Sequence, residues 1–199
     1  MDDSTDVIPP PGANETVQVS IGRQSTAIAW ADPSADPSEA NGTEAHPYPT
    51  LQAAFDSVCS LDGANGCVVL AKAGTYGTGQ TDFDYQGYTG HTRLLITNTC
   101  RIVAVDGCAR TFLVGSPDTS TLSSATAPGC GANAVNAIAM TSLAQVQGFT
   151  ITGSYSTTGS GYYTPGRGPI FTYGNDLEVT DCVISNNVGA YYAVPLPNL

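Results

Sequence analysis

Two segments near the end of the chain share a nine-residue pattern, thirty-three residues apart. VQGFTITGS, residues 146–154, aligns with VTDCVISNN, residues 179–187, and apolar residues coincide at the first, fourth and sixth places. The third place holds Gly148 in one copy and Asp181 in the other, and both residue types tolerate a left-handed backbone. We therefore expect a sharp bend there, between two short strands. A bend that recurs in each repeat predicts a solenoid, because every turn must change direction at the same point to stack on the previous turn.

Short β-branched runs separated by Gly, Asn, Ser and Thr fill the chain from Arg93 onward. Such runs are typical of either a β-sandwich or a coil of parallel strands, and the repeated bend favours the coil. The expected strands are RLLITN, RIVAV, TFLVG, NAIAM, AQVQGFTIT, GPIFTY and LEVTDCVIS. Earlier in the chain, short strands are expected at residues 16–21 and 26–31.

One helix is expected, directly before the strand run CVVLAKAGTY, which Gly74 is expected to end. The helix has an apolar stripe at i, i+3, i+4, i+7 and i+8, made of Leu51, Ala54, Phe55, Val58 and Cys59. Thr50 is placed to cap its N-terminus. A helix of about nine residues is marginal alone in water, so it must cover an apolar surface.

The charge of the chain excludes several classes of partner. It has 6 basic and 17 acidic residues, a net charge of −11, and only 12% charged residues. Binding to nucleic acid needs clustered cations, and an anionic membrane surface attracts basic segments, so neither partner is expected. No apolar run approaches the ~20 residues that span a bilayer, so no membrane span is expected either.

The cysteines form an even set of six: Cys59, Cys67, Cys100, Cys108, Cys130 and Cys182. Cys59/Cys67 and Cys100/Cys108 are each separated by eight residues, which suits local disulfides in an oxidising compartment. Reduced thiols in the core are the alternative, and the connectivity stays open. Because no CxxC pair occurs and the two histidines are far apart, no metal site is expected.

The first part of the chain carries a resemblance to a known family. Its residues are, in order, Trp30-Ala31-Asp32, Asn41-Gly42-Thr43-Glu44-Ala45, Tyr48 to Asp56, Val68-Val69-Leu70 and Ala73-Gly74-Thr75-Tyr76. This series resembles the N-terminal part of the right-handed parallel β-helix proteins of the pectin-lyase-like superfamily. The later repeats look like the rungs of that family, so the resemblance extends over residues 30–193.

The resemblance implies an all-β fold, a right-handed parallel β-helix (solenoid) with a short N-terminal capping α-helix. We expect an N-terminal arm over residues 1–29, an entry strand, loop and capping helix over 30–66, and rungs over 67–199. The rungs have room for about three or four turns. Their C-terminal end is expected to be open, truncated, or covered by another copy or by the arm.

Catalytic members of this family use carboxylates that hold calcium beside a Lys or Arg base, or several Asp residues. The weak candidates here are Asp176, Glu178, Asp181 and Arg167, and no stretch matches a catalytic set of the family. Asp181 is better explained as the bend residue, and the other two acids as solvated charges. No cofactor is expected. Calcium is the open alternative, in the loop containing Asp32, Asp36 and Glu39, where Asp-Pro turns explain two of the acids.

Tyrosines are the better candidates for ligand contacts. They lie among small polar residues in two segments expected to be loops, DFDYQGYTG and GSYSTTGSGYYTPGRG. The candidates are Tyr85, Tyr88, Tyr155, Tyr162 and Tyr163. Planar aromatic rings on a neutral surface suit contacts with sugars or proteins, and packing against the outside of the coil is the alternative.

The sequence thus predicts a secreted or cell-surface β-helix module with a structural or adhesive role. Self-association end to end, or a place in a longer surface protein, fits this prediction, and a polysaccharide or a surface protein is the expected partner. The alternatives are a polysaccharide-cleaving enzyme, either a lyase or a glycoside hydrolase, and a carbohydrate-binding scaffold without catalysis.

Overall fold

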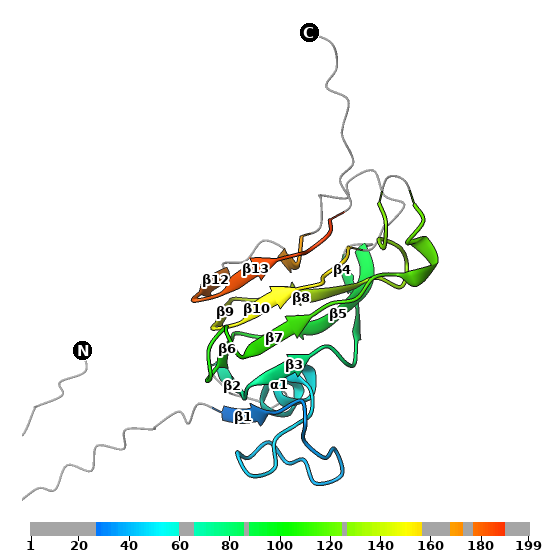
Figure 1. Ribbon diagram of the computed structural model, residues 1–199. Coiled ribbons are helices and arrows are strands. Elements are labelled where there is room, and N and C mark those ends of the chain that lie inside the picture. The colour runs from blue at the N-terminus through cyan, green and yellow to red at the C-terminus, as the bar shows by residue number, and fades with distance from the viewer. Residues whose placement is uncertain are drawn as a thin grey trace, which may run out of the picture.

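The computed structural model describes residues 27–59, 66–85, 88–124, 127–156, 168–172 and 177–189, with the backbone alone at positions 85 and 88. These residues form three sheets, and Figure 1 shows the strands of each sheet stacked one above another. Sheet A contains, in order, β1 (Ala27–Ala31), β2 (Cys67–Ala71), β6 (Cys100–Ala104), β9 (Ala144–Gln147) and β12 (Leu177–Thr180). Sheet B contains β3 (Gly74–Tyr76), β7 (Thr111–Val114), β10 (Thr150–Thr152) and β13 (Val183–Ser185). Sheet C contains β4 (Thr81–Tyr85), β5 (Tyr88–Ile96), β8 (Val135–Met140) and β11 (Ile170–Thr172).

From β2 onward the chain passes through sheets A, B and C in turn and then returns to sheet A. We call one such passage a circuit. Each return places a strand beside the equivalent strand of the previous circuit, and every described strand pair except β4–β5 is parallel. The described fold is therefore all-β, with parallel sheets and one α-helix, as expected.

The thirty-three-residue pattern joins two neighbouring circuits. Val146 pairs with Val179 in sheet A, and Ile151 pairs with Ile184 in sheet B. Between these pairs, the Val183 amide donates to the Phe149 carbonyl at 2.9 Å. The prediction that the two copies stack in register is confirmed.

The bend predicted at the third place of the pattern is also confirmed. Gly148 has φ +81° and Asp181 has φ +53°, which are left-handed values that glycine and aspartate accept most readily. A Cβ at Gly148 would lie 2.9 Å from the Ala104 carbonyl oxygen. A second bend, at Gly153 (φ +60°) and Asn186 (φ +53°), was not predicted.

The main core lies between the sheets. Alternate residues of the strands point inward, and these are almost fully buried: Val69 (0% exposed), Ile102 (0%) and Val146 (1%) from sheet A, with Leu113 (1%) and Ile151 (0%) from sheet B. Leu94, Ile96, Ile138 and Met140 of sheet C join the same cluster. A smaller cluster outside sheet C contains the stacked rings of Phe83 and Phe171.

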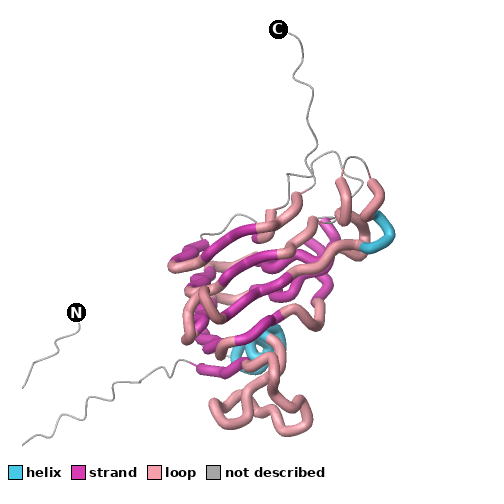
Figure 2. The backbone as a smooth tube through the Cα atoms, viewed as in Figure 1, coloured by secondary structure: helices cyan, strands magenta, loops and turns pink. Residues whose placement is uncertain are grey.

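Helix α1 (Leu51–Cys59) lies at the N-terminal end of the stack, as Figure 2 shows in cyan. The predicted stripe is confirmed, because Leu51, Ala54, Phe55 and Val58 are buried. The Ala53 amide donates to the Thr50 hydroxyl oxygen at 3.1 Å, so the predicted cap is confirmed as well. The helix contacts β1, β2 and β5 and covers one end of the core.

The outer edge of β1 is covered by the loop that precedes the helix. The Trp30 amide donates to the Gly42 carbonyl at 2.8 Å, and the Tyr48 amide donates to the Trp30 carbonyl at 2.9 Å. The Asp32 amide donates to the Tyr48 carbonyl at 2.8 Å. An exposed strand edge is a template for pairing with another strand. This loop occupies the edge of β1 by pairing with the backbone of Trp30 and Asp32.

The structure corrects two strand predictions. The run CVVLAKAGTY contains two strands, β2 and β3, and Gly74 (φ +143°) begins the second instead of ending the first. Glycine is needed there because a Cβ would lie 2.4 Å from the Pro33 ring. The segment DFDYQGYTG, expected as a loop, contains β4 and the start of β5, which pair antiparallel. The sequence between the two strands lacks the Asn-Gly or Asp-Gly pair that is the strongest signal for a hairpin. The strand predicted at residues 16–21 lies outside the described residues.

Within the described ranges, no helix is both long enough and apolar enough to cross a membrane.

Candidate binding surface on sheet A

The outward side chains of sheet A form two rows that cross all five of its strands. Strand register defines the first row as Ile28, Val68, Arg101, Gln145 and Glu178. It defines the second as Trp30, Leu70, Val103, Gln147 and Thr180. We call these ten residues the sheet A surface. Its N-terminal half is apolar, and its C-terminal half carries amide, carboxylate and hydroxyl groups.

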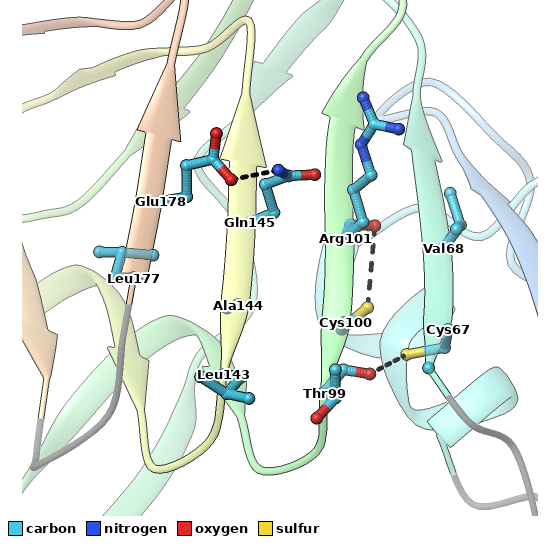
Figure 3. A pocket seen from close by; sticks show the side chains of 11 residues that line it. Cys67, Val68, Thr99, Cys100, Arg101, Leu143, Ala144, Gln145, Leu177 and Glu178 are labelled. Carbon is cyan, nitrogen blue, oxygen red and sulfur yellow. Dashed lines mark hydrogen bonds between the residues drawn. The ribbon is translucent and has the colours of Figure 1, made fainter.

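A pocket of about 460 Å³ lies where the strands of sheet A begin. It extends across four strands, from Val68 through Arg101 and Gln145 to Glu178, with the exposed side chain of Leu143 beside it. Figure 3 shows these side chains side by side on β2, β6, β9 and β12. The pocket is thus elongated across the strands, and each circuit contributes one outward residue to it.

Hydrogen bonds between circuits hold the polar half of the surface. The Arg101 guanidinium donates to the Gln147 side-chain oxygen at 2.8 Å, and the Gln147 amide group donates to the Asp181 carboxylate at 2.9 Å. The Gln145 amide group donates to the Glu178 carboxylate, as the dashed line in Figure 3 marks. These bonds link residues more than thirty positions apart and fix how their polar atoms are oriented.

This arrangement suits binding. Each of the two carboxylates accepts a hydrogen bond from a neutral side-chain amide. Amide side chains carry both donors and acceptors, which match hydroxyl groups. Trp30 and the aliphatic residues provide an apolar area for the C–H faces of a ligand. The Lys72 ammonium lies 5.9 Å from the centroid of the Trp30 ring.

The structure brings together only part of the predicted catalytic set. Glu178 lies on β12 and Asp181 follows that strand, and their carboxylates accept hydrogen bonds from Gln145 and Gln147. Asp176 and Arg167 lie outside the described residues. Sequence reasoning missed Arg101, Gln145 and Gln147. The repeat contained a usable signal, because extending the alignment by one residue toward the N-terminus pairs Gln145 with Glu178.

The tyrosine predictions have a mixed outcome. Tyr155 is half-buried, and its ring packs so closely on Gly129 that a Cβ there would lie 2.6 Å from it. This ring therefore packs against the segment between β7 and β8 that contains Gly129. Tyr85 and Tyr88 pair with each other in the β4–β5 hairpin instead of lying in a loop. Their side chains, and the whole of Tyr162 and Tyr163, lie outside the described residues.

The acidic residues of the long loop form local turns. The Asp32 carboxylate accepts hydrogen bonds from the amide and hydroxyl of Ser34 at 2.9 and 2.6 Å. Asp36 does the same with Ser38 at 2.8 and 2.7 Å, which lowers the pKa of the Asp36 carboxyl. Glu39 lies 3.8 Å from the His46 ring nitrogen. Each aspartate thus has the turn role that the Asp-Pro pairs predict.

One of the two predicted local disulfides is confirmed, between Cys59 and Cys67. The other is wrong, because Cys100 and Cys108 are both free thiols. Cys100 begins β6 and Cys108 follows it, so an extended strand separates them. Five residues at about 3.3 Å each exceed the reach of a disulfide. Cys130 and Cys182 are also free.

No protein-family model, no curated protein and no solved structure matches this chain.

Proposed function

We propose that the chain is a secreted or cell-surface module of structural or adhesive function, built as a right-handed parallel β-helix of the pectin-lyase-like kind. In this proposal the sheet A surface binds an extended polysaccharide without cleaving it. The fold proposal is supported by the repeated order of sheets A, B and C, by the two-residue bends at 148–149 and 181–182, and by the helix that covers the N-terminal end.

The observation that carries the binding proposal is the pair of unbroken rows on sheet A. Strands in a sheet are spaced about 4.7–4.9 Å apart, so the rows present groups at a regular interval along the stack. A polymer of repeating units can meet such groups one after another. A sugar has apolar C–H faces and polar hydroxyl groups. The C–H faces match the apolar half of the sheet A surface, which contains Trp30, and the hydroxyl groups match the polar half, which contains Gln145 and Gln147.

An extracellular location is supported by the Cys59–Cys67 disulfide. Disulfides form and persist in oxidising compartments and are rare in the cytosol. A disulfide at the capping helix also fits a module that must keep its end closed outside the cell.

Binding can be tested by co-sedimentation with insoluble polysaccharides and by calorimetry with soluble neutral and acidic ones. We expect the full chain to bind at least one of them. A Gln145→Ala/Gln147→Ala double variant should bind at least tenfold more weakly, since it loses amide contacts. The matched control is Thr75→Ala, which changes an exposed residue on the outside of sheet B and should leave affinity unchanged. Failure to bind any polysaccharide, or equal affinity in the double variant, would refute the proposal.

The alternative enzyme function is favoured by one observation, that the carboxylates of Glu178 and Asp181 both accept hydrogen bonds from side chains of the sheet A surface. It is tested in the same samples by measuring reducing ends and the absorbance of unsaturated products. Turnover that disappears in Asp181→Ala would replace the binding proposal with catalysis.

Self-association is proposed only through the C-terminal end of the stack. Ile184 occupies an inward position of the last described circuit, yet it is 50% exposed, whereas its neighbour Ile151 is fully buried. The opposite end is covered by α1 and the loop before it. Two copies can therefore meet at their open ends, and the expected product is a dimer. Light scattering tests this, and a polymer would contradict it.

A further inference from the structure

Three sulfur atoms meet beneath the capping helix. Cys59 and Cys67 form the disulfide, and the free thiol of Cys100 joins them, with all three sulfurs within 4.8 Å of one another. Cys59 ends α1, Cys67 begins β2 and Cys100 begins β6. The cluster therefore connects the cap with two successive strands of sheet A.

The backbone geometry suits a bond between Cys67 and Cys100. The two residues are register partners on adjacent parallel strands, and each is only 3% exposed. Adjacent strands lie about 4.7–4.9 Å apart, and the Cα atoms of a disulfide are usually about 4.4–6.8 Å apart. Cys59 and Cys67, now bonded, have Cα atoms 6.1 Å apart. Cys67 thus has two partners within reach.

The cluster also has contact with the pocket at sheet A. Cys67, Thr99 and Cys100 all line it, and Figure 3 shows the two cysteines side by side at the start of their strands. The contacts of the sulfurs outside the disulfide are weak: Cys67 Sγ lies 3.7 Å from the Thr99 carbonyl oxygen, and Cys100 Sγ lies 3.8 Å from the Arg101 carbonyl oxygen. The Cys100 sulfur is therefore held by packing and is not fixed by a strong hydrogen bond.

We propose that Cys67 exchanges its disulfide partner between Cys59 and Cys100. The Cys100 thiol gives its proton to water from the pocket, and the thiolate attacks the sulfur of Cys67. The Cys67–Cys100 bond forms as the Cys59–Cys67 bond breaks. The electron pair of the broken bond stays on the Cys59 sulfur, which then takes up a proton. One disulfide and one thiol are present before and after, so the step needs no oxidant or reductant.

The two disulfide pairings of Cys67 link different elements of the fold. The Cys59–Cys67 bond ties the C-terminal end of α1 to β2. A Cys67–Cys100 bond ties β2 to β6 instead and leaves α1 held by packing and by its hydrogen bonds to Leu95 and Asn98. Burial raises the pKa of the Cys100 thiol to about 12, and only the thiolate attacks. The exchange is therefore slow in the closed fold and faster whenever the cap loosens.

The test is disulfide mapping in a Cys59→Ser variant of the full chain, produced under oxidising conditions. Acid quenching, proteolysis without reduction and mass spectrometry should find a Cys67–Cys100 disulfide in most molecules. A matched Cys182→Ser variant should keep the Cys59–Cys67 bond and a free Cys100. Recovery of Cys67 and Cys100 as separate alkylated thiols in a folded Cys59→Ser protein would overturn the proposal.

Thiol labelling of the wild-type protein provides a second, independent measurement in case the Cys59→Ser variant does not fold. Native protein is incubated at pH 8 and sampled over days with a thiol-alkylating reagent. Exchange predicts that label appears on Cys59 and that a Cys67–Cys100 peptide appears with it. Label that accumulates on Cys100 while Cys59 stays unlabelled would refute the exchange.

Discussion

The two ends of the stack differ in how their apolar interiors are closed. At the N-terminal end, Ala31 is fully buried and Leu51 and Phe55 are each 2% exposed, because α1 lies over the core. At the C-terminal end, the inward Ile184 is 50% exposed. The same inward position in earlier circuits holds Tyr76, Leu113 and Ile151, with exposures of 4%, 1% and 0%.

This difference separates two requirements for ending a stack of strands. The interior needs an apolar cover, which the stripe of α1 provides. The terminal strand at each end of the stack also needs partners for the hydrogen-bonding groups on its outer edge. At the N-terminal end, the loop residues Gly42 and Tyr48 provide these partners for β1. Among the described residues, neither requirement is met at β12 and β13. Substitutions at the two ends test whether they differ in stability as they differ in exposure.

The largest effect is expected at the covered end. Phe55→Ala should lower the free energy of unfolding by about 3–5 kcal/mol, since it removes a buried aromatic ring. Urea denaturation followed by fluorescence measures this. Ile28→Ala is the control at the same end, because Ile28 is 55% exposed and should change stability by less than about 0.5 kcal/mol. Equal losses in the two variants would mean that α1 does not close the core.

A matched pair compares one position in two circuits. Ile151→Ala should cost about 2–5 kcal/mol, because the side chain is fully buried. Ile184→Ala, its register partner in the next circuit, should cost about 1 kcal/mol or less, because half of the side chain already meets water. The measurement is the same denaturation curve. An equal loss at Ile184 would show that the last circuit is covered in solution.

The bend offers a smaller contrast between circuits. Gly148→Ala should destabilise the fold by at least about 1–2 kcal/mol, the usual cost of a left-handed conformation for alanine. The crowding against the Ala104 carbonyl adds to this. Asp181→Gly removes the strain of the left-handed backbone but also loses the hydrogen bond from the Gln147 side chain. The two effects oppose each other, so the free energy of unfolding should change by no more than about 1 kcal/mol. Thermal unfolding distinguishes them, and a neutral Gly148→Ala would contradict the bend assignment.

The smallest effect concerns Tyr76 at the covered end. Its hydroxyl donates toward the carbonyls of Ala31 at 2.9 Å and Lys72 at 3.0 Å, so Tyr76→Phe should cost about 0.5–1.5 kcal/mol.

The same residue predicts a pH dependence. Burial raises the pKa of the Tyr76 hydroxyl, with a smaller contribution from the Asp32 carboxylate. An unfolded tyrosine ionises near about pH 10, so this stabilisation is complete below that pH and falls as pH rises above it. Tyr76→Phe should therefore lose less stability than the wild type as the pH rises above about 10. Parallel curves for the two proteins would contradict the prediction.

The sequence predicted the features that depend on neighbouring residues. The helix and its Thr50 cap follow from a local stripe and a local hydrogen bond, and the bend follows from a residue type that tolerates positive φ. The second bend was missed because Gly153 and Asn186, at the eighth place of the pattern, were not recognised as a pair. The Cys59–Cys67 disulfide was predictable because only seven residues separate the end of a helix from the start of a strand.

The sheet A surface could not be predicted in the same way. Its residues come together only through strand register, and the spacing between register partners varies. Cys67 pairs with Cys100, thirty-three residues on, but Cys100 pairs with Ala144, forty-four residues on. A single repeat length therefore aligns Gln145 with Glu178 but fails to bring Arg101 beside them. The polar contact between Arg101 and Gln147 was hidden for this reason.

The matching register of successive circuits has a consequence for how such a chain can change in length. Val146 and Val179 are register partners on adjacent strands of sheet A, so residues 146–178 make up one thirty-three-residue circuit. A tandem duplication of this segment would add one full layer in the middle of the stack and leave the contacts at both ends as they are. Such a duplication needs no new cap, and the two rows of the sheet A surface would lengthen with each added layer.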